Sequence, residues 1–297
     1  MPPSRPFAAP LVIFGLAAML GAAGCSSTSA SAPADSGGAP AGDGAPGTSD
    51  GAPGDGPGNT GDASPGATPF FRDDFEAGTP GHQPAGWDNF LSYQKNVANP
   101  QGDGTLALID TLHAHGGSHA VHFHGGSSPA MITRPLPAGT NRLYVRAWVY
   151  QTRQLGMNPG ANHETLLGIR KAAGTANDEV RFGEIKGVIG TNEVPSDNIA
   201  PKMAQWGMGP AIAANTWACF EVAFLGDQPQ HVLQAWIDGA LVHSITAPDQ
   251  WQNGTMPATW LNGKFVEVIF GWHSFSNATN DVWIDDIALA TNRIGCQ

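Results

Sequence analysis

The sequence is short of cations: 14 Lys and Arg stand against 25 Asp and Glu among 297 residues, so the net charge is −11. Such a chain lacks the basic surface with which nucleic-acid binders neutralise phosphates, and that class of function is therefore excluded. An anionic polymer is repelled at long range, so a uronic-acid polymer would need local cations or a bound metal ion to be held. Nucleophilic catalysis has little support, because residues 70–297 contain no Gly-x-Ser-x-Gly elbow.

The apolar run at the N-terminus, residues 11–21, is too short to span a bilayer. It leads through small residues to Ala-Ala-Gly-Cys at 22–25, which resembles the bacterial lipobox except that Ala22 replaces the usual Leu. We expect residues 1–24 to be a lipoprotein signal peptide and Cys25 to carry the lipid. Signal cleavage without lipidation, or a lone buried cysteine, are the alternatives. The expected location is the cell envelope, at the outer membrane or cell surface, or otherwise outside the cell.

Branched aliphatic and aromatic side chains are absent between Cys25 and Phe70. A segment built almost wholly from Gly, Ala, Pro, Ser, Thr and Asp cannot bury enough apolar surface to offset its ordering entropy. We therefore interpret residues 25–69 as a lipidated cysteine followed by a flexible tether, and residues 70–297 as one domain.

Cysteine is scarce, with three in the chain. If Cys25 carries the lipid, Cys219 and Cys296 remain in an oxidising compartment, and we predict that they form a disulfide. Closing so long a loop constrains the unfolded chain by roughly 4 kcal/mol in the entropy model.

The domain shows alternation with period two and no sustained helical period, which predicts an all-β fold. The Asp238-Gly239 dipeptide predicts a two-residue hairpin turn between two such runs. We expect an antiparallel β-sandwich of the jelly-roll type, in which two sheets pack together. The expected strands are 106–111, 119–125, 142–151, 163–171, 179–189, 217–225, 231–238, 240–246, 265–275 and 281–290.

Acidic residues lie at both ends of the domain. Asp285 and its neighbour Asp286 point to opposite faces of a regular strand, so one of them must find a partner inside the protein. A hard cation that gathers carboxylate and carbonyl oxygens removes the cost of burying such a carboxylate. We predict that Glu76 and Asp285 bind Ca²⁺, together with backbone carbonyls of the turn that contains Gly116 and His119. The alternative is that these acids accept hydrogen bonds from backbone amides.

Five histidines, at positions 113, 115, 119, 122 and 124, lie near one another in the sequence. His122 and His124 share one strand face and could chelate zinc or copper. A solvated strand face explains the same spacing, and no third ligand is evident.

A third set of strand residues could line a sugar-binding groove, because it combines aromatic rings with charged groups. Tryptophan in a β-sandwich is more often a core residue. Arg181 and Glu184 point to opposite faces of a regular strand, so both reach one groove only if a bulge separates them. The set is His163, Arg181, Glu184, Lys186, Trp236, Trp272 and His273.

Several stretches together resemble the cellulose-induced protein family of fungi and soil bacteria. They are Asp-Asp-Phe-Glu at 73–76, Ala-His-Gly-Gly-Ser at 114–118, Tyr-Val-Arg-Ala-Trp at 144–148, Asn-His at 162–163, Cys-Phe-Glu at 219–221, Phe-Gly-Trp at 270–272, Val-Trp-Ile-Asp-Asp-Ile at 282–287 and Arg-Ile-Gly-Cys at 293–296. The resemblance implies a jelly roll similar to glucuronan lyases, with calcium held by the equivalents of Glu76, Asp285 and the loop around Gly116 and His119. It also implies that His163 and Arg181 occupy cleft positions.

This chain departs from the family pattern after Arg181, where Glu184, Ile185 and Lys186 replace a stretch that contains Gln. A Gln that neutralises the substrate carboxylate is therefore missing from that position.

Three functions follow as hypotheses. The first is a lyase that cleaves a uronic-acid polysaccharide by β-elimination, with His163 as base and with Arg181 and Lys186 neutralising the carboxylate. In this hypothesis Glu184, Trp236, Trp272 and His273 bind substrate, and His273 or Tyr150 protonates the leaving oxygen. The second is a monomeric lipoprotein that binds polysaccharide without catalysis, and the third is a structural surface protein.

Overall fold

The computed structural model describes residues 66–158, 160–171, 178–252, 256–257, 259–261 and 265–296. The expected signal peptide and Cys25 lie outside the described residues, as does nearly all of the tether. Within the described part, no helix is both long enough and apolar enough to cross a bilayer.

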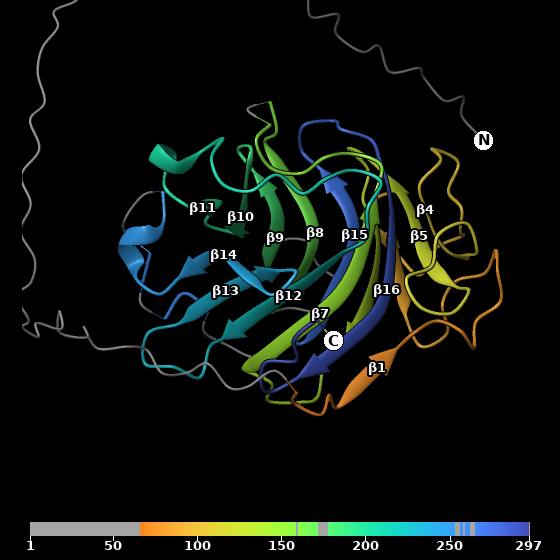
Figure 1. Cartoon of the computed structure of the whole chain (residues 1–297), viewed down its shortest axis with the longest axis horizontal. Coiled ribbons are helices and arrows are strands. Elements are labelled where there is room, and N and C mark those ends of the chain that lie inside the picture. The colour runs from red at the N-terminus through yellow and green to blue at the C-terminus, as the bar shows by residue number, and fades with distance from the viewer. Residues whose placement is uncertain are drawn as a thin grey trace, which may run out of the picture. The chain divides into compact units, whose positions relative to one another are not determined.

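In the described residues, the domain consists of strands with two short 3-10 helices (Figure 1). In chain order the elements are β1 (Phe71–Asp73), β2 (Asp88–Leu91), β3 (Gln94–Lys95), β4 (Leu106–Asp110), β5 (Ala120–Gly125), β6 (Ala130–Pro135), β7 (Arg142–Gln151), β8 (His163–Arg170), β9 (Glu179–Ile185), β10 (Val188–Glu193), β11 (Asn198–Ala200), η1 (Met203–Gln205), β12 (Ala218–Leu225), β13 (Val232–Ile237), β14 (Ala240–Ile245), η2 (Pro248–Gln250), β15 (Glu267–Ser274) and β16 (Asn280–Ala290).

These strands form two antiparallel sheets of eight strands each. Sheet A has the order β14-β13-β12-β7-β16-β5-β4, with β1 added alongside β16. Sheet B has the order β11-β10-β9-β8-β15-β6-β2-β3. The sheets pack face to face as a sandwich (Figure 1), which confirms the predicted jelly roll.

Alternation along each strand separates the core from the two outer faces, meaning the faces turned away from the other sheet. On β7, Leu143, Val145, Ala147 and Val149 are buried in the main core, whereas the residues between them lie on the outer face of sheet A. On β9 of sheet B, Phe182 enters the same core. Whether a residue occupies an inward or an outward position in this alternation therefore decides on which face of the sheet its side chain lies.

Two predictions about covalent and turn geometry are confirmed. Cys219 on β12 is bonded to Cys296, which ties the C-terminal segment to sheet A. Asp238 and Gly239 have φ of +50° and +82° and join β13 to β14, as a two-residue hairpin with positive φ requires.

The single strand predicted at 179–189 is wrong: the structure has two strands, β9 and β10, with a tight turn between them. The turn residues Lys186 and Gly187 have φ of +52° and +74°. The prediction failed because every residue of β9 and β10 is buried, so no change in pattern marks the turn between them. β6 was missed for a related reason: its first four residues are all buried, so no alternation is visible.

Candidate functional site

The outer face of sheet B carries the residues that the sequence assigned to catalysis. Arg181 alternates on β9 with Val180 and Phe182, both of which enter the core, so its side chain lies on the outer face. His163 begins β8 and pairs with Ile185, and His273 on β15 pairs with Thr165 of β8. The three side chains therefore come from three neighbouring strands and one sheet face.

The ring of Phe275 stands at the centre of this group. The Arg181 guanidinium carbon lies 5.0 Å from its centroid, and the centroids of the His273 and His163 rings lie at 4.1 Å and 6.2 Å. Phe275 is 41% exposed, so its ring meets solvent next to the charged group. An exposed aromatic ring beside a guanidinium suits the apolar face of a sugar and its carboxylate.

Arg181 is held by a row of ion pairs that crosses sheet B. Its Nε donates to Glu179 at 2.7 Å, and the other oxygen of Glu179 accepts from Arg170 at 2.6 Å. Glu267 lies 3.4 Å from Arg170 and 2.5 Å from the ammonium group of Lys95. Because three of these side chains are almost fully buried, the row fixes the position of Arg181.

Electrostatics keep His163 neutral. Burial lowers the pKa of His163, the positive charges of Lys186 and Arg181 lower it further, and the Asp197 carboxylate opposes them. Asp197 lies 3.7 Å from Nδ1 of His163. A neutral imidazole near neutral pH can accept a proton, so His163 has the protonation state of a general base. Lys186 Nζ also donates to the side chain of Asn162, the residue before His163.

Tyr93 is a residue of this face that sequence reasoning missed. Its hydroxyl lies 3.0 Å from Nε2 of His273 and donates to the Ser127 carbonyl at 2.8 Å. The ring is 54% exposed. Burial, together with the charge of Arg181, lowers the pKa of His273 to about 3, so this imidazole stays neutral. The short β2–β3 turn that carries Tyr93 gives no sequence signal, although an exposed Tyr with φ of +63° is an unusual feature.

Four other sequence candidates lie elsewhere. Trp272 is fully buried in the core. Trp236 lies on the outer face of sheet A, where the guanidinium carbon of Arg293 is 4.4 Å from its ring centroid. Tyr150 lies on the same outer face, in contact with Trp283. The structure does not bring these three to His163, because Trp272 points into the core and the other two lie on the outer face of sheet A.

Glu184, the fourth, points from β9 toward the core and pairs with Glu164 of β8. Both side chains are fully buried. Burial and the neighbouring Glu164 raise the pKa of Glu184 to about 8, against the opposing charge of Arg153. One guanidinium nitrogen of Arg153 lies 3.3 Å from Glu164 and 3.6 Å from Glu184. The two carboxylates therefore share a proton inside the protein and are not part of the outer face.

The residues predicted to bind calcium meet at one turn between β4 and β5. Glu76 Oε1 accepts from the backbone N–H of Ser118 and His119 at 2.8 Å and 2.7 Å. Asp285 Oδ2 accepts from the N–H of His115 and Gly116 at 2.9 Å and 3.2 Å. Two acids from opposite ends of the domain thus hold the same turn through backbone amides, which is the arrangement that the alternative interpretation predicted.

Two observations bear on whether this turn fits a calcium ion. Burial and the neighbouring Asp286 raise the pKa of Asp285 to about 6, although three backbone N–H groups donate to its carboxylate. A Cβ on Gly117 would lie 2.4 Å from the Glu76 carboxylate, so only glycine lets that acid approach. Carboxylate oxygens are donors that Ca²⁺ prefers, but those of Glu76 and Asp285 accept backbone N–H groups of the turn in this structure.

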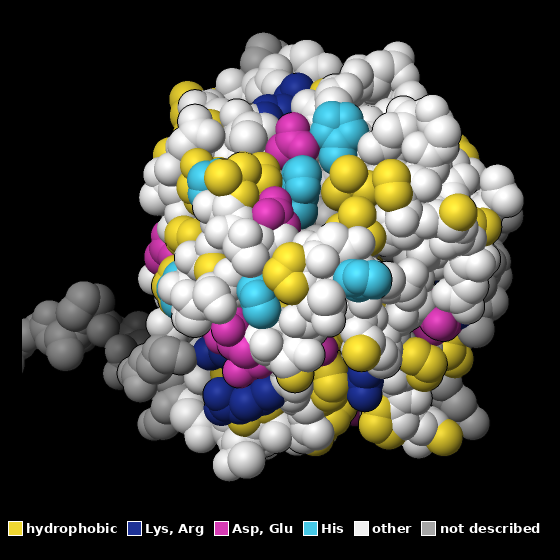
Figure 2. Space-filling view, turned by 90° about the vertical axis from the view of Figure 1, so that its right-hand side faces the viewer, with side chains coloured by type: hydrophobic (Ala, Val, Ile, Leu, Met, Phe, Trp, Pro, Cys, Tyr) yellow, Lys and Arg dark blue, Asp and Glu magenta, His cyan; other side chains and the backbone are white. Residues whose placement is uncertain are grey.

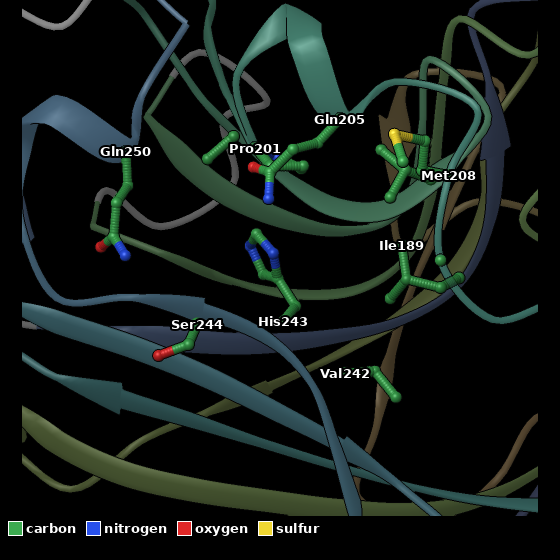
Figure 3. Close-up of a pocket in the computed structure, with 11 residues that line it drawn as sticks. Ile189, Pro201, Gln205, Met208, Val242, His243, Ser244 and Gln250 are labelled. Carbon is green, nitrogen blue, oxygen red and sulfur yellow. The ribbon is translucent and has the colours of Figure 1, made fainter. Parts of the chain in front are cut away.

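A further cavity lies between β10, β11 and β14, with a volume of about 230 Å³ (Figure 3). His243 points into it, and the side chains of Gln205 and Gln250 approach from the opposite wall. Burial lowers the pKa of His243 to about 4, and its Nε2 lies 3.1 Å from the Thr191 hydroxyl. Among the residues that the structure describes, no charged side chain lines this cavity, and none supplies the cation that a uronate requires.

The fold and this face define a jelly-roll sandwich with a cationic, aromatic outer surface on one sheet. The model of the Cip1-like core domain of the polysaccharide-lyase-like family matches residues 83–292, and the chain belongs to that family. No curated protein matches the sequence.

Three solved structures are similar to this chain, and the first of them supports the fold. Cellulose-induced protein Cip1 is 24% identical, with 76% of this chain and 100% of that chain covered and a TM-score of 0.55. An endo-β-1,4-glucuronan lyase from the fungus Trichoderma reesei is 11% identical, with 76% and 96% covered and a TM-score of 0.44. The globular domain of T. cruzi calreticulin is 6% identical, with 76% and 88% covered and a TM-score of 0.48.

Proposed function

We propose that this protein is an extracytoplasmic lipoprotein whose jelly-roll domain cleaves a uronic-acid polysaccharide by β-elimination on the outer face of sheet B. The observation that carries the proposal is the meeting of a neutral imidazole, two cations, a tyrosine hydroxyl and an exposed aromatic ring on one surface. Membership of a polysaccharide-lyase-like family supports the substrate class.

In the proposed reaction His163 removes the C5 proton of a uronate, and the C4–O bond breaks as a C4=C5 double bond forms. Arg181 and Lys186 neutralise the carboxylate and stabilise the charge that develops when the proton leaves. The Tyr93 hydroxyl donates its proton to the departing O4, and the N–H of His273 stabilises the resulting phenolate. This assignment replaces Tyr150, which lies on the other sheet.

Positive charges near His163 also explain how a chain with a net charge of −11 could hold an anionic polymer. The chain as a whole repels polyanions, but Arg181 and Lys186 place positive charge where the carboxylate would lie. Lys186, in the tight turn that follows β9, then takes over the role of the missing Gln of the family pattern.

Calcium at the turn held by Glu76 and Asp285 belongs to the same proposal. Those carboxylates, with backbone oxygens around Gly116 and His119, would hold the ion, and the ion would supply positive charge that fixes the β4–β5 connection. Lipidation of Cys25 would anchor the protein to the cell envelope.

The test is the ultraviolet absorbance of unsaturated uronate when the purified protein meets polyuronates in the presence of calcium. We expect Y93F and H163A to lose at least about 100-fold in rate, in line with removal of a general acid or base. The matched control is Y150F, which keeps near wild-type activity because its ring lies on sheet A.

Binding without catalysis is the second candidate, and the exposure of Phe275 and Tyr93 favours it. It predicts retention on a polyuronate affinity gel that F275A abolishes, with no unsaturated product from any polymer. That pair of results would replace the lyase by a binding module.

A further inference from the structure

The outer face of sheet A carries histidine and aspartate side chains whose function is not accounted for by the proposed reaction. Figure 2 shows histidine side chains scattered among acidic and apolar ones on the side of the domain that carries β4 and β5. Three of the side chains on this face, from two adjacent strands, concern us here: His122 and His124 of β5, and Asp281 of β16.

Strand register brings these three together. Asp281 pairs directly with His124, and Trp283 pairs with His122. His122 Nε2 lies 2.8 Å and His124 Nδ1 lies 2.9 Å from the same oxygen, Oδ1 of Asp281. The two imidazole nitrogens therefore converge on one point, and the third ligand that the sequence did not reveal comes from the neighbouring strand.

His122 is also held in place by neighbouring side chains other than Asp281. Its ring stacks on Trp283 with centroids 4.2 Å apart and an interplanar angle of 4°. Asp110 accepts from the Trp283 indole N–H at 2.9 Å, and the same oxygen lies 3.6 Å from Nδ1 of His122. The stack on Trp283 therefore holds the plane of the His122 ring, and the Asp110 carboxylate lies near its other nitrogen.

We propose that His122, His124 and Asp281 bind a divalent transition metal ion of the zinc, nickel or copper type. Two imidazoles and one carboxylate suit these ions better than calcium, which prefers oxygen ligands alone. Two adjacent β-strands hold the donors, so the site is rigid at its base.

Binding requires one local movement. Asp281 Oδ1 now occupies the point onto which the imidazoles converge, and among the described residues no group of three or more His, Cys, Asp or Glu side chains is placed to hold a metal ion as it stands. The Asp281 side chain is 34% exposed, so it can rotate toward solvent and return as a ligand. Its carboxylate then exchanges two hydrogen bonds for one bond to the metal.

The experiment is calorimetric titration of the full-length protein with Zn²⁺, with calcium in excess to fill any oxygen site. We expect one ion per chain, at least tenfold weaker binding in H124A and in D281A, and no change in H82A. His82 is the matched control because it is an exposed histidine of the same domain that belongs to none of the three ligands.

A second measurement protects the result from folding effects. Electron paramagnetic resonance of one bound Cu²⁺ should show coupling to two nitrogens in the wild type and to one in H124A, whose exposed side chain can be truncated without disturbing the Trp283 stack. Equal affinity of wild type, H124A and D281A, or no Zn²⁺ binding at about 1 mM, would overturn the proposal. Neither outcome depends on lyase activity.

Discussion

Replacement of Glu184 by Gln should stabilise the protein in alkaline solution without harming carbohydrate binding. Glu184 Oε1 accepts the Gly156 N–H at 3.0 Å, while the opposite side of the carboxyl group faces Glu164. A glutamine can keep the first interaction with its oxygen and donate an N–H to Glu164. Glu184→Gln therefore imitates the protonated form of the acid at every pH.

The magnitude follows from the raised pKa. A folded-state pKa of about 8 against 4.5 means that the folded protein keeps a proton that the unfolded chain releases between these values. Stability is fully present below about pH 4.5 and falls by roughly 1.4 kcal/mol per pH unit until about pH 8. The wild type should lose about 3 kcal/mol by neutral pH and about 5 kcal/mol above pH 8, and E184Q should lose neither.

The assay is urea unfolding at a series of pH values from about 4 to 9, with the free energy extrapolated to water. Asp249, which is exposed, supplies the control D249N, whose curve should run parallel to the wild type. Parallel curves for wild type and E184Q would refute the account of the buried acid pair. Loss of polyuronate retention in E184Q would instead place Glu184 in the sugar-binding groove.

Three further predictions concern the site, the calcium turn and the disulfide. The acid limb of the pH profile of kcat/KM should lie below about pH 6.5, because burial and the nearby cations lower the pKa of His163, and K186M should move that limb upward. In the presence of a chelator, the free energy of unfolding should fall by about 3 kcal/mol as the pH rises from about 4 to 6, because the pKa of Asp285 is raised. Added calcium should remove this fall. A melting temperature that calcium does not change would contradict the proposed calcium site. Joint replacement of Cys219 and Cys296 by Ser should cost about 4 kcal/mol in denaturant unfolding, because a link across 77 residues is lost, and a much smaller loss would be inconsistent with a constrained unfolded chain.

Local sequence signals predicted much of the fold because many strands have one covered face. The 142–151 strand coincides with β7, whose inner residues alternate with polar and aromatic outer ones. The Asp238-Gly239 turn and the Cys219–Cys296 pair needed only dipeptide chemistry and cysteine counting. Strands buried on both faces, such as β9 and β10, gave one continuous run, and the turn between them was lost.

The sequence predicted site residues only where alternation along a strand was enough to place their side chains on one face of the sheet. His163, Arg181 and His273 share one face of sheet B, as their strand positions allowed. Tyr93 could not be found, because its approach to His273 spans 180 residues and depends on the pairing of β2 with β6. For the same reason the sequence did not predict that Asp281 contacts His122 and His124, because neither segment alone determines how the two strands align.

The most direct test of the proposed reaction is proton NMR of a polyuronate digest made by the purified protein. Elimination predicts a vinylic proton signal from the new C4=C5 bond, in proportion to the chain ends formed, and no such signal with H163A. Chain ends that accumulate without a vinylic proton would show hydrolysis instead, and an intact polymer after prolonged incubation with a panel of polyuronates would contradict catalysis by this face.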